Sequence, residues 1–103
     1  MVAGLTMGDA MIRVLIERRV REGAGPKYEC LQRELRFEAL REHGYFTGET
    51  LRDLDDAHHY IVISTWRSRH DWDGWKATDA RQQVLERLAP LVVSERITLF
   101  EHA

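Results

Sequence analysis

The chain has 103 residues, of which 44% are hydrophobic and 31% are charged. This length supports one compact domain with one hydrophobic core and is too short for two. Seventeen acidic side chains slightly outnumber fifteen basic ones, for a formal net charge of −2, so the chain lacks the broad basic surface that attracts nucleic acids or anionic membranes. We therefore expect no nucleic-acid partner.

Three further features lead us to expect a cytoplasmic protein. The longest uncharged hydrophobic stretch, residues 60–66, is far shorter than the roughly 20 residues that span a bilayer. Residues 1–10 lack the basic start and apolar centre of a secretory signal, and they predict a flexible tail before a domain at residues 11–103. Cys30 is the only cysteine, which rules out an internal disulfide. We expect a soluble protein without a membrane partner.

The first predicted element is a β-strand over residues 11–20. Four of its five even positions are apolar: Ile12, Val14, Ile16 and Val20. Because Met11 and Leu15 are apolar on the opposite side, both faces of this strand are expected to be covered. A turn with two glycines follows, and apolar residues then recur at spacings of three and four. This spacing predicts an amphipathic helix of about four turns, from Pro26 to the region of Gly44.

The next two elements are predicted to form a β-hairpin. Residues 45–54 alternate loosely, 55–57 supply turn-forming aspartates, and 58–66 have the composition of a buried strand. Tyr60, Val62, Ser64 and Trp66 face one way, and Ile61, Ile63 and Thr65 face the other. Neither face of the second strand is suited to water.

The hydrophobic period then changes from that of a strand to that of a helix. Ser68 is predicted to be the N-cap of a helix, with Asp71 three residues later and with Trp72 and Trp75 in the helix. All three tryptophans of the chain therefore lie at this junction, which includes Trp66. This arrangement places the end of the strand against an aromatic helix.

The remaining chain predicts one more helix and one more strand. Thr78 can cap a helix that ends at Pro90, and residues 92–101 form the final strand. The resulting order predicts an α+β ferredoxin-like fold, a split βαβ unit with helices on one face of an antiparallel sheet. Since the strands are apolar on both faces, we expect a second copy to cover the open face and form a homodimer.

Four segments in combination carry a resemblance to a known family. They are the first strand with Glu17-Arg-Arg19, the arm Gly44-Tyr-Phe-Thr-Gly-Glu-Thr-Leu51, the strand Tyr60-Ile-Val-Ile-Ser-Thr-Trp66, and the helix with Trp72 and Trp75. Together they resemble the antibiotic biosynthesis monooxygenase family of dimeric α+β barrels over about residues 11–100. Some members oxidise polycyclic aromatic phenols to quinones with O₂ and without metal or flavin, others degrade heme, and many have no known function. The fold alone does not choose among these activities.

The family's heme degraders need an asparagine, a tryptophan and a heme-ligating histidine. Trp66 matches the tryptophan, but Arg18 stands at the position of the asparagine and Leu85 at that of the histidine. Leucine does not ligate iron. The resemblance therefore disfavours heme as a cofactor and keeps a heme-binding or heme-degrading protein as an alternative.

The resemblance favours a cofactor-independent monooxygenase that acts on a small aromatic or quinol-like substrate. Trp66 would supply a flat apolar wall on the helix-facing side of the sheet. Arg18 and Ser64 share the parity of the inward-facing residues, so Arg18 could stabilise a phenolate or enolate and Ser64 could orient it. Three more residues would complete the substrate-binding wall: Tyr28, Tyr60 and Trp75.

Simpler interpretations stand beside these predictions. The tryptophans can be core packing, and Arg18 can pair with Glu101 or with a carboxylate of a partner chain. No metal site is expected at His58 and His59, because adjacent strand residues point to opposite faces. The alternative of a different class is a non-catalytic dimeric module that binds a small ligand.

Overall fold

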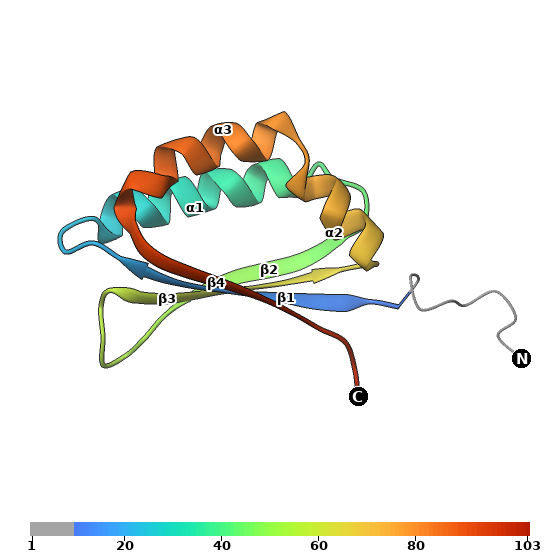
Figure 1. The fold of residues 1–103 in the computed structure, drawn as a ribbon, viewed down its shortest axis with the longest axis horizontal. Coiled ribbons are helices and arrows are strands. Elements are labelled where there is room, and N and C mark those ends of the chain that lie inside the picture. Colours follow the sequence, from blue (N-terminus) through green and yellow to red (C-terminus); the bar gives the residue numbers. More distant parts are fainter. Residues whose placement is uncertain (1–9) are drawn as a thin grey trace, which may run out of the picture.

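A four-stranded antiparallel sheet forms one layer of the molecule, and the helices cover one of its faces (Figure 1). The computed structural model describes residues 10–103, so the tail predicted over residues 1–10 lies outside the described residues except for Ala10. The spatial order of the strands is β2-β3-β1-β4. This is the predicted α+β ferredoxin-like arrangement, and the fold prediction is confirmed.

The elements follow one another in the predicted order. The strands are β1 (Ile12–Val20), β2 (Tyr45–Arg52), β3 (His59–Trp66) and β4 (Val92–Phe100). The helices are α1 (Gly25–Ala39), α2 (Arg69–Lys76) and α3 (Asp79–Leu88), and α3 continues into the short 3₁₀ helix η2 (Ala89–Leu91). Helix α1 begins one residue before Pro26, and the chain then turns through Gly44, whose φ of +88° favours glycine.

Two side-chain caps fix the starts of the helices that follow β3. The Asp71 amide donates to the Ser68 hydroxyl at 3.2 Å, and the Arg81 amide donates to the Thr78 hydroxyl at 3.3 Å. Both caps were predicted, and each satisfies a backbone donor that would otherwise lack a partner in the first helical turn. No helix within residues 10–103 is both long enough and apolar enough to cross a membrane.

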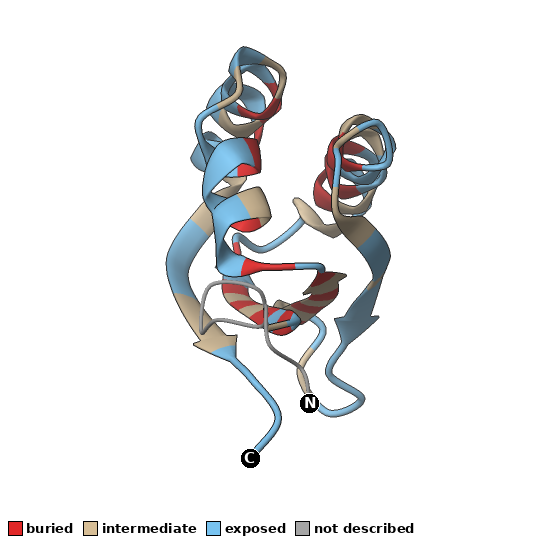
Figure 2. Cartoon of the chain, turned by 90° about the vertical axis from the view of Figure 1, so that its right-hand side faces the viewer, coloured by how far each residue is buried: buried red, intermediate tan, exposed pale blue. Residues whose placement is uncertain are grey.

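Strand register decides which side chains point toward the helices. Ile16 pairs with Val62, Arg18 pairs with Tyr60, and all four are buried on the helix-facing side of β1 and β3. On β2 the same register places Gly48 opposite Ser64. The predicted parity of the two central strands is therefore confirmed. Figure 2 shows that the buried residues gather between the sheet and the helices above it.

The core divides into two clusters along the sheet. The larger contains Ile12, Val14, Ile16, Leu35, Ala39, Val62, Trp66, Trp72, Trp75 and Val84. The smaller contains Val20, Tyr28, Leu31, Tyr60 and Leu88. Because aromatic rings bury more area than aliphatic side chains, the three tryptophans make the larger cluster the dominant hydrophobic contribution to folding.

The face of the sheet away from the helices is only half covered. Ile61, Ile63 and Thr65 on β3 are intermediate in exposure, whereas the other side of the same strand is buried. Leu51 at 45% and Phe100 at 50% exposure add apolar surface on the neighbouring strands. The prediction that both faces are covered is therefore met on one face only within a single chain.

Candidate functional site

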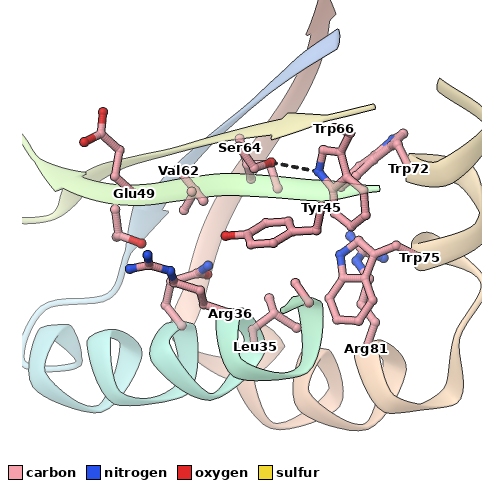
Figure 3. A pocket seen from close by; sticks show the side chains of 15 residues that line it. Leu35, Arg36, Tyr45, Glu49, Val62, Ser64, Trp66, Trp72, Trp75 and Arg81 are labelled. Carbon is pink, nitrogen blue, oxygen red and sulfur yellow. Dashed lines mark hydrogen bonds between the residues drawn. The ribbon is translucent and has the colours of Figure 1, made fainter. Parts of the chain in front are cut away.

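A mostly apolar cavity lies between the sheet and the helices, in the larger core cluster (Figure 3). Its volume is about 40 Å³. The lining residues come from every layer: Ile16, Gln32, Leu35, Arg36, Ala39, Tyr45, Gly48, Glu49, Thr50, Val62, Ser64, Trp66, Trp72, Trp75 and Arg81. This volume holds a few water molecules and is far below the roughly 300 Å³ at which ordinary ligand pockets begin.

Trp66 forms the centre of an aromatic wall in this cavity. The residue is 1% exposed, and its ring meets Tyr45 and Trp72 edge to face, at 5.2 and 5.8 Å between centroids. Trp75 stacks on it at 6.2 Å with an interplanar angle of 25°. The Trp66 indole N–H donates to the Ser64 hydroxyl at 3.1 Å, so the polar edge of the ring is satisfied and the ring is held in one orientation.

Arg81 is the buried cationic group of the cavity, whereas Arg36, which also lines it, is exposed. The residue is 7% exposed, and its guanidinium carbon lies 5.6 Å from the centroid of the Trp72 ring. Burial lowers the pKa of this guanidinium and the nearby Arg18 charge lowers it further, while the Glu95 carboxylate opposes both effects. Among residues 10–103 the Arg81 side chain has no hydrogen bond or ion pair. A mostly buried cation that makes no ion pair is costly, so the cavity is suited to a ligand that brings negative charge.

Tyr45 fills much of the space that the wall encloses. Its ring lies among Trp66, Ser64 and Leu35 in Figure 3, and the residue is only half-buried at the start of β2. Burial raises the pKa of the Tyr45 hydroxyl, while nearby Arg36 opposes that shift. A Cβ atom at Gly48 would clash with the Tyr45 hydroxyl, so glycine there is what gives the ring its place. The small volume of the cavity is thus a consequence of this one ring.

The six residues predicted to bind substrate lie in two regions. Trp66, Ser64 and Trp75 line the apolar cavity. Tyr60 lies in a separate polar cavity beside α1, and Tyr28 packs against its ring at 4.7 Å in the smaller core cluster. Arg18 lines neither cavity. The residues therefore share a face of the sheet, as parity predicted, without sharing one site.

Arg18 is held in a network of its own. Its Nε donates to Glu95 at 2.8 Å, and its Nη1 donates to Gln32 at 2.7 Å and to the Tyr28 hydroxyl at 3.1 Å. The side chain is fully buried, and within the described chain its Nη2 has no partner. The sequence-based alternative paired Arg18 with Glu101 or a partner chain, whereas the structure pairs it with Glu95 on β4.

Sequence reasoning missed Arg81, although a signal was present. Arg81 lies three residues before Val84 and seven before Leu88, which places it on the apolar stripe of α3. A charged residue at a position of the buried stripe is an exception that could have been read as a site residue. Tyr45 left no comparable signal, since its position follows from the irregular register between Tyr45 and Thr47.

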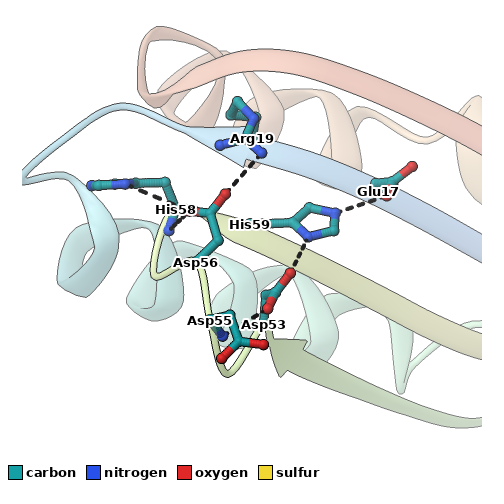
Figure 4. Close-up of polar contacts among 7 residues, drawn as sticks. All are labelled: Glu17, Arg19, Asp53, Asp55, Asp56, His58 and His59. Atoms are coloured by element: carbon teal, nitrogen blue, oxygen red, sulfur yellow. Dashed lines mark hydrogen bonds and ion pairs between the residues drawn. The ribbon is translucent and has the colours of Figure 1, made fainter.

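A polar cluster stands on the open face of the sheet (Figure 4). The ring of His59 bridges two carboxylates, with Nδ1 at 2.9 Å from Asp53 and Nε2 at 2.7 Å from Glu17. Both hydrogen bonds raise the pKa of His59, and the bond to Asp53 has the larger effect. In the described part of the chain, residues 10–103, no group of three or more His, Cys, Asp or Glu is arranged to hold a metal ion. Both ring nitrogens of His59 are already engaged with carboxylates.

A model of a known family matches this chain over most of its length. The family is described as antibiotic biosynthesis monooxygenase, and the match covers residues 11–87. The chain belongs to this family. No curated protein matches the chain.

Solved structures of antibiotic biosynthesis monooxygenase folds and of related proteins superimpose closely. SnoaB, a cofactor-independent oxygenase from Streptomyces nogalater, has a TM-score of 0.85 and 18% identity, over 91% of this chain and 94% of that one. A conserved protein from Methanosarcina mazei has a TM-score of 0.85 and 16% identity, over 94% of this chain and 97% of that one. A conserved protein of unknown function from Bacteroides thetaiotaomicron has a TM-score of 0.83 and 21% identity, over 91% of this chain and 99% of that one. At these identities the likeness concerns the fold.

The heme-degrading branch of the antibiotic biosynthesis monooxygenase family needs a ligand that this cavity does not offer. Leu85, at the position aligned with the histidine, is half-buried and packs against the larger core cluster. All five histidines of the chain lie within the described residues, and none lines the apolar cavity. The residues present therefore do not fit heme ligation there.

Proposed function

We propose that the protein is a cofactor-independent monooxygenase that oxidises a small phenolic or quinol-like aromatic compound in the apolar cavity. The observation that supports this proposal most directly is the buried Arg81 guanidinium beside the Trp66 wall, which forms no ion pair within residues 10–103. The cavity offers an aromatic surface and a positive charge, and a deprotonated aromatic ligand uses both. Its ring packs on the indole of Trp66, and its oxygen accepts hydrogen bonds from the guanidinium. Family membership and the likeness to a cofactor-independent oxygenase agree with it.

The substrate ring would take the place that the Tyr45 ring occupies. Tyr45 meets Trp66 edge to face at 5.2 Å, so its position already has the geometry of an aromatic guest. Rotation of this half-buried side chain to another rotamer, out of the cavity, frees about the volume of one phenol ring. Ser64 then stands beside the ligand, although its hydroxyl already accepts from Trp66.

The chemistry needs few protein groups. The positive charge of Arg81 favours loss of the phenolic proton to water, and it stabilises the resulting phenolate or carbanion. The electron-rich carbon, which still carries a hydrogen, transfers electrons to O₂ and forms a C–O bond, and the resulting peroxide anion takes up a proton from water to give a hydroperoxide. Loss of water from that hydroperoxide leaves the quinone carbonyl, so one oxygen atom enters the product and the other leaves as water. Exclusion of bulk solvent by the tryptophan wall protects the reactive intermediate.

We infer that the working form is a homodimer in which the open sheet faces meet. Ile61, Ile63 and Leu51 on that face leave apolar area exposed in the single chain, and the family resemblance implies the same pairing. Light scattering is expected to give a mass about twice 12.1 kDa. Ile63→Asp is expected to give a monomer, whereas Phe37→Asp on exposed α1 leaves the mass unchanged; a monomeric wild type contradicts this inference.

A non-catalytic module that binds a small ligand is the second candidate function. The small volume of the cavity favours it, because a site that admits an aromatic ring only when Tyr45 moves can bind a ligand without turning it over. The two functions differ in one observable quantity, which is consumption of O₂.

Oxygen uptake by metal-free, heme-free protein against a panel of hydroquinones and anthrone-like phenols tests the proposal. Wild-type protein is expected to consume O₂ above background, and Trp66→Phe to do so about threefold to tenfold more slowly, since the smaller ring loses part of the aromatic contact. The dimer mass and unfolding midpoint of the variant serve as its control. Unchanged uptake with lost stability would assign Trp66 to packing, and no uptake across the panel would favour the ligand-binding module.

A further inference from the structure

A second, polar cavity adjoins the apolar one along α1. Its volume is about 370 Å³, and it lies between α1 and the inner side of β2 and β3. Gln32, Arg36 and Thr50 line both cavities. The polar cavity is therefore the natural extension of the apolar site toward solvent, and a ligand longer than one ring system would reach into it.

Arginines dominate this cavity. Three arginines and a single carboxylate line it, together with neutral polar groups. The carboxylate is already engaged, because Glu29 accepts from the Tyr60 hydroxyl at 2.6 Å and from Arg52 at 3.1 Å. Glu29 therefore neutralises Arg52 and leaves the other two arginines, Arg33 and Arg36, as the net charge of the cavity.

Arg33 and Arg36 form no ion pair within residues 10–103. They lie three residues apart, so they project from the same side of α1. Glu49 is the other acidic residue near the boundary of the two cavities, and in Figure 3 its carboxylate points away from Arg36. Register agrees with the picture, since Glu49 pairs with Ile63 on the open face of the sheet.

We propose that Arg33 and Arg36 bind an anionic oxygen group, a carboxylate or a phosphate, carried by an aromatic ligand whose ring lies against Trp66. Guanidinium groups bind both anions through paired N–H donors. The ligand is then amphipathic, with an aromatic body in the dry cavity and an acidic end at its mouth. This inference rests on the proposed function for the position of the ring, and it adds the chemical class of the ligand.

Binding measurements by tryptophan fluorescence test this inference without requiring turnover. The probes are a hydroxynaphthoate with its carboxylate opposite the hydroxyl, its neutral methyl ester, and naphthyl phosphate. Wild-type protein is expected to bind the acid about tenfold more tightly than the ester, and added NaCl to weaken only the anionic probes. Whichever anionic probe binds more tightly, the carboxylate or the phosphate, identifies the kind of acidic group that the subsite prefers. Tighter binding of either one supports the subsite.

Two substitutions separate the arginines from general charge effects. Arg33→Gln combined with Arg36→Gln is expected to remove the preference for the acid, so that acid and ester bind with equal affinity. Arg41→Gln is the matched control, because Arg41 is exposed just beyond α1 and lines neither cavity. Equal binding of acid and ester by wild type, or a preference that survives the double substitution, would overturn the inference and leave the aromatic pocket standing. Absence of binding for all probes would overturn both proposals.

Discussion

Replacing Arg81 with methionine is expected to slow oxygen uptake about a hundredfold, the size of effect seen when one preorganised oxyanion donor is removed. Arg81 is the buried cation that lines the cavity without an ion pair in the described chain, so no neighbouring guanidinium of the same environment replaces it. Methionine keeps most of the apolar length of the side chain, so the Trp72 contact is largely retained.

The same substitution has a second expected result that packing alone does not produce. A bound phenol such as naphthol should have a pKa lower by about 1–3 units in wild type than in Arg81→Met, because an opposite charge at close range favours the phenolate. Absorbance of the bound phenol against pH measures the difference. The unfolding free energy of the variant is expected to equal or exceed that of wild type, since a desolvated charge is removed.

Arg87→Met is the matched control for this prediction. Arg87 lies on the same helix and is about half exposed, where it pairs with Glu34. Its removal should change neither uptake nor the pKa of the bound phenol. If Arg81→Met kept wild-type uptake and an unchanged phenol pKa, Arg81 would have no part in the chemistry.

Glu95→Ala is expected to lower the unfolding free energy by about 3 kcal/mol, because it leaves Arg18 as a buried charge without its carboxylate. Arg18 is fully buried, whereas the Glu95 side chain is 37% exposed, so the cost is borne mainly by the arginine. The figure lies at the lower end of what breaking a buried pair costs, since solvent screens the exposed partner. Urea denaturation at fixed protein concentration measures the change.

Adding Arg18→Met to Glu95→Ala is expected to recover part of the lost stability. The double variant has no buried charge, and methionine fills much of the space that the arginine stem occupied. Glu34→Ala is the control on the surface, where loss of the exposed pair with Arg87 costs less than about 1 kcal/mol. A Glu95→Ala protein as stable as Glu34→Ala would contradict the assignment of Arg18 as a buried charge that needs a partner. Oxygen uptake by the double variant is expected to persist, since Arg18 does not line the cavity.

Arg18 and Arg81 also show which features of this protein sequence patterns can predict and which they cannot. Alternation along β1 correctly placed Arg18 on the helix-facing side, but alternation is silent about position along the strand. Two strand positions separate Arg18 from Ile16, and only Ile16 lines the apolar cavity. A site assignment based on a shared face therefore joined residues that packing divides between two clusters.

Residue patterns were enough to predict the order of the elements, the two helix caps and the inward face of each central strand. These are local properties, since each depends on residues a few positions apart. Only the contacts of the folded chain show that Arg18 pairs with Glu95 while Arg81 forms no ion pair within the described residues, and that Tyr45 fills the space beside Trp66. Those outcomes depend on how β4, α3 and β2 approach the same part of the sheet, and contacts between segments distant in the chain leave no period in the sequence.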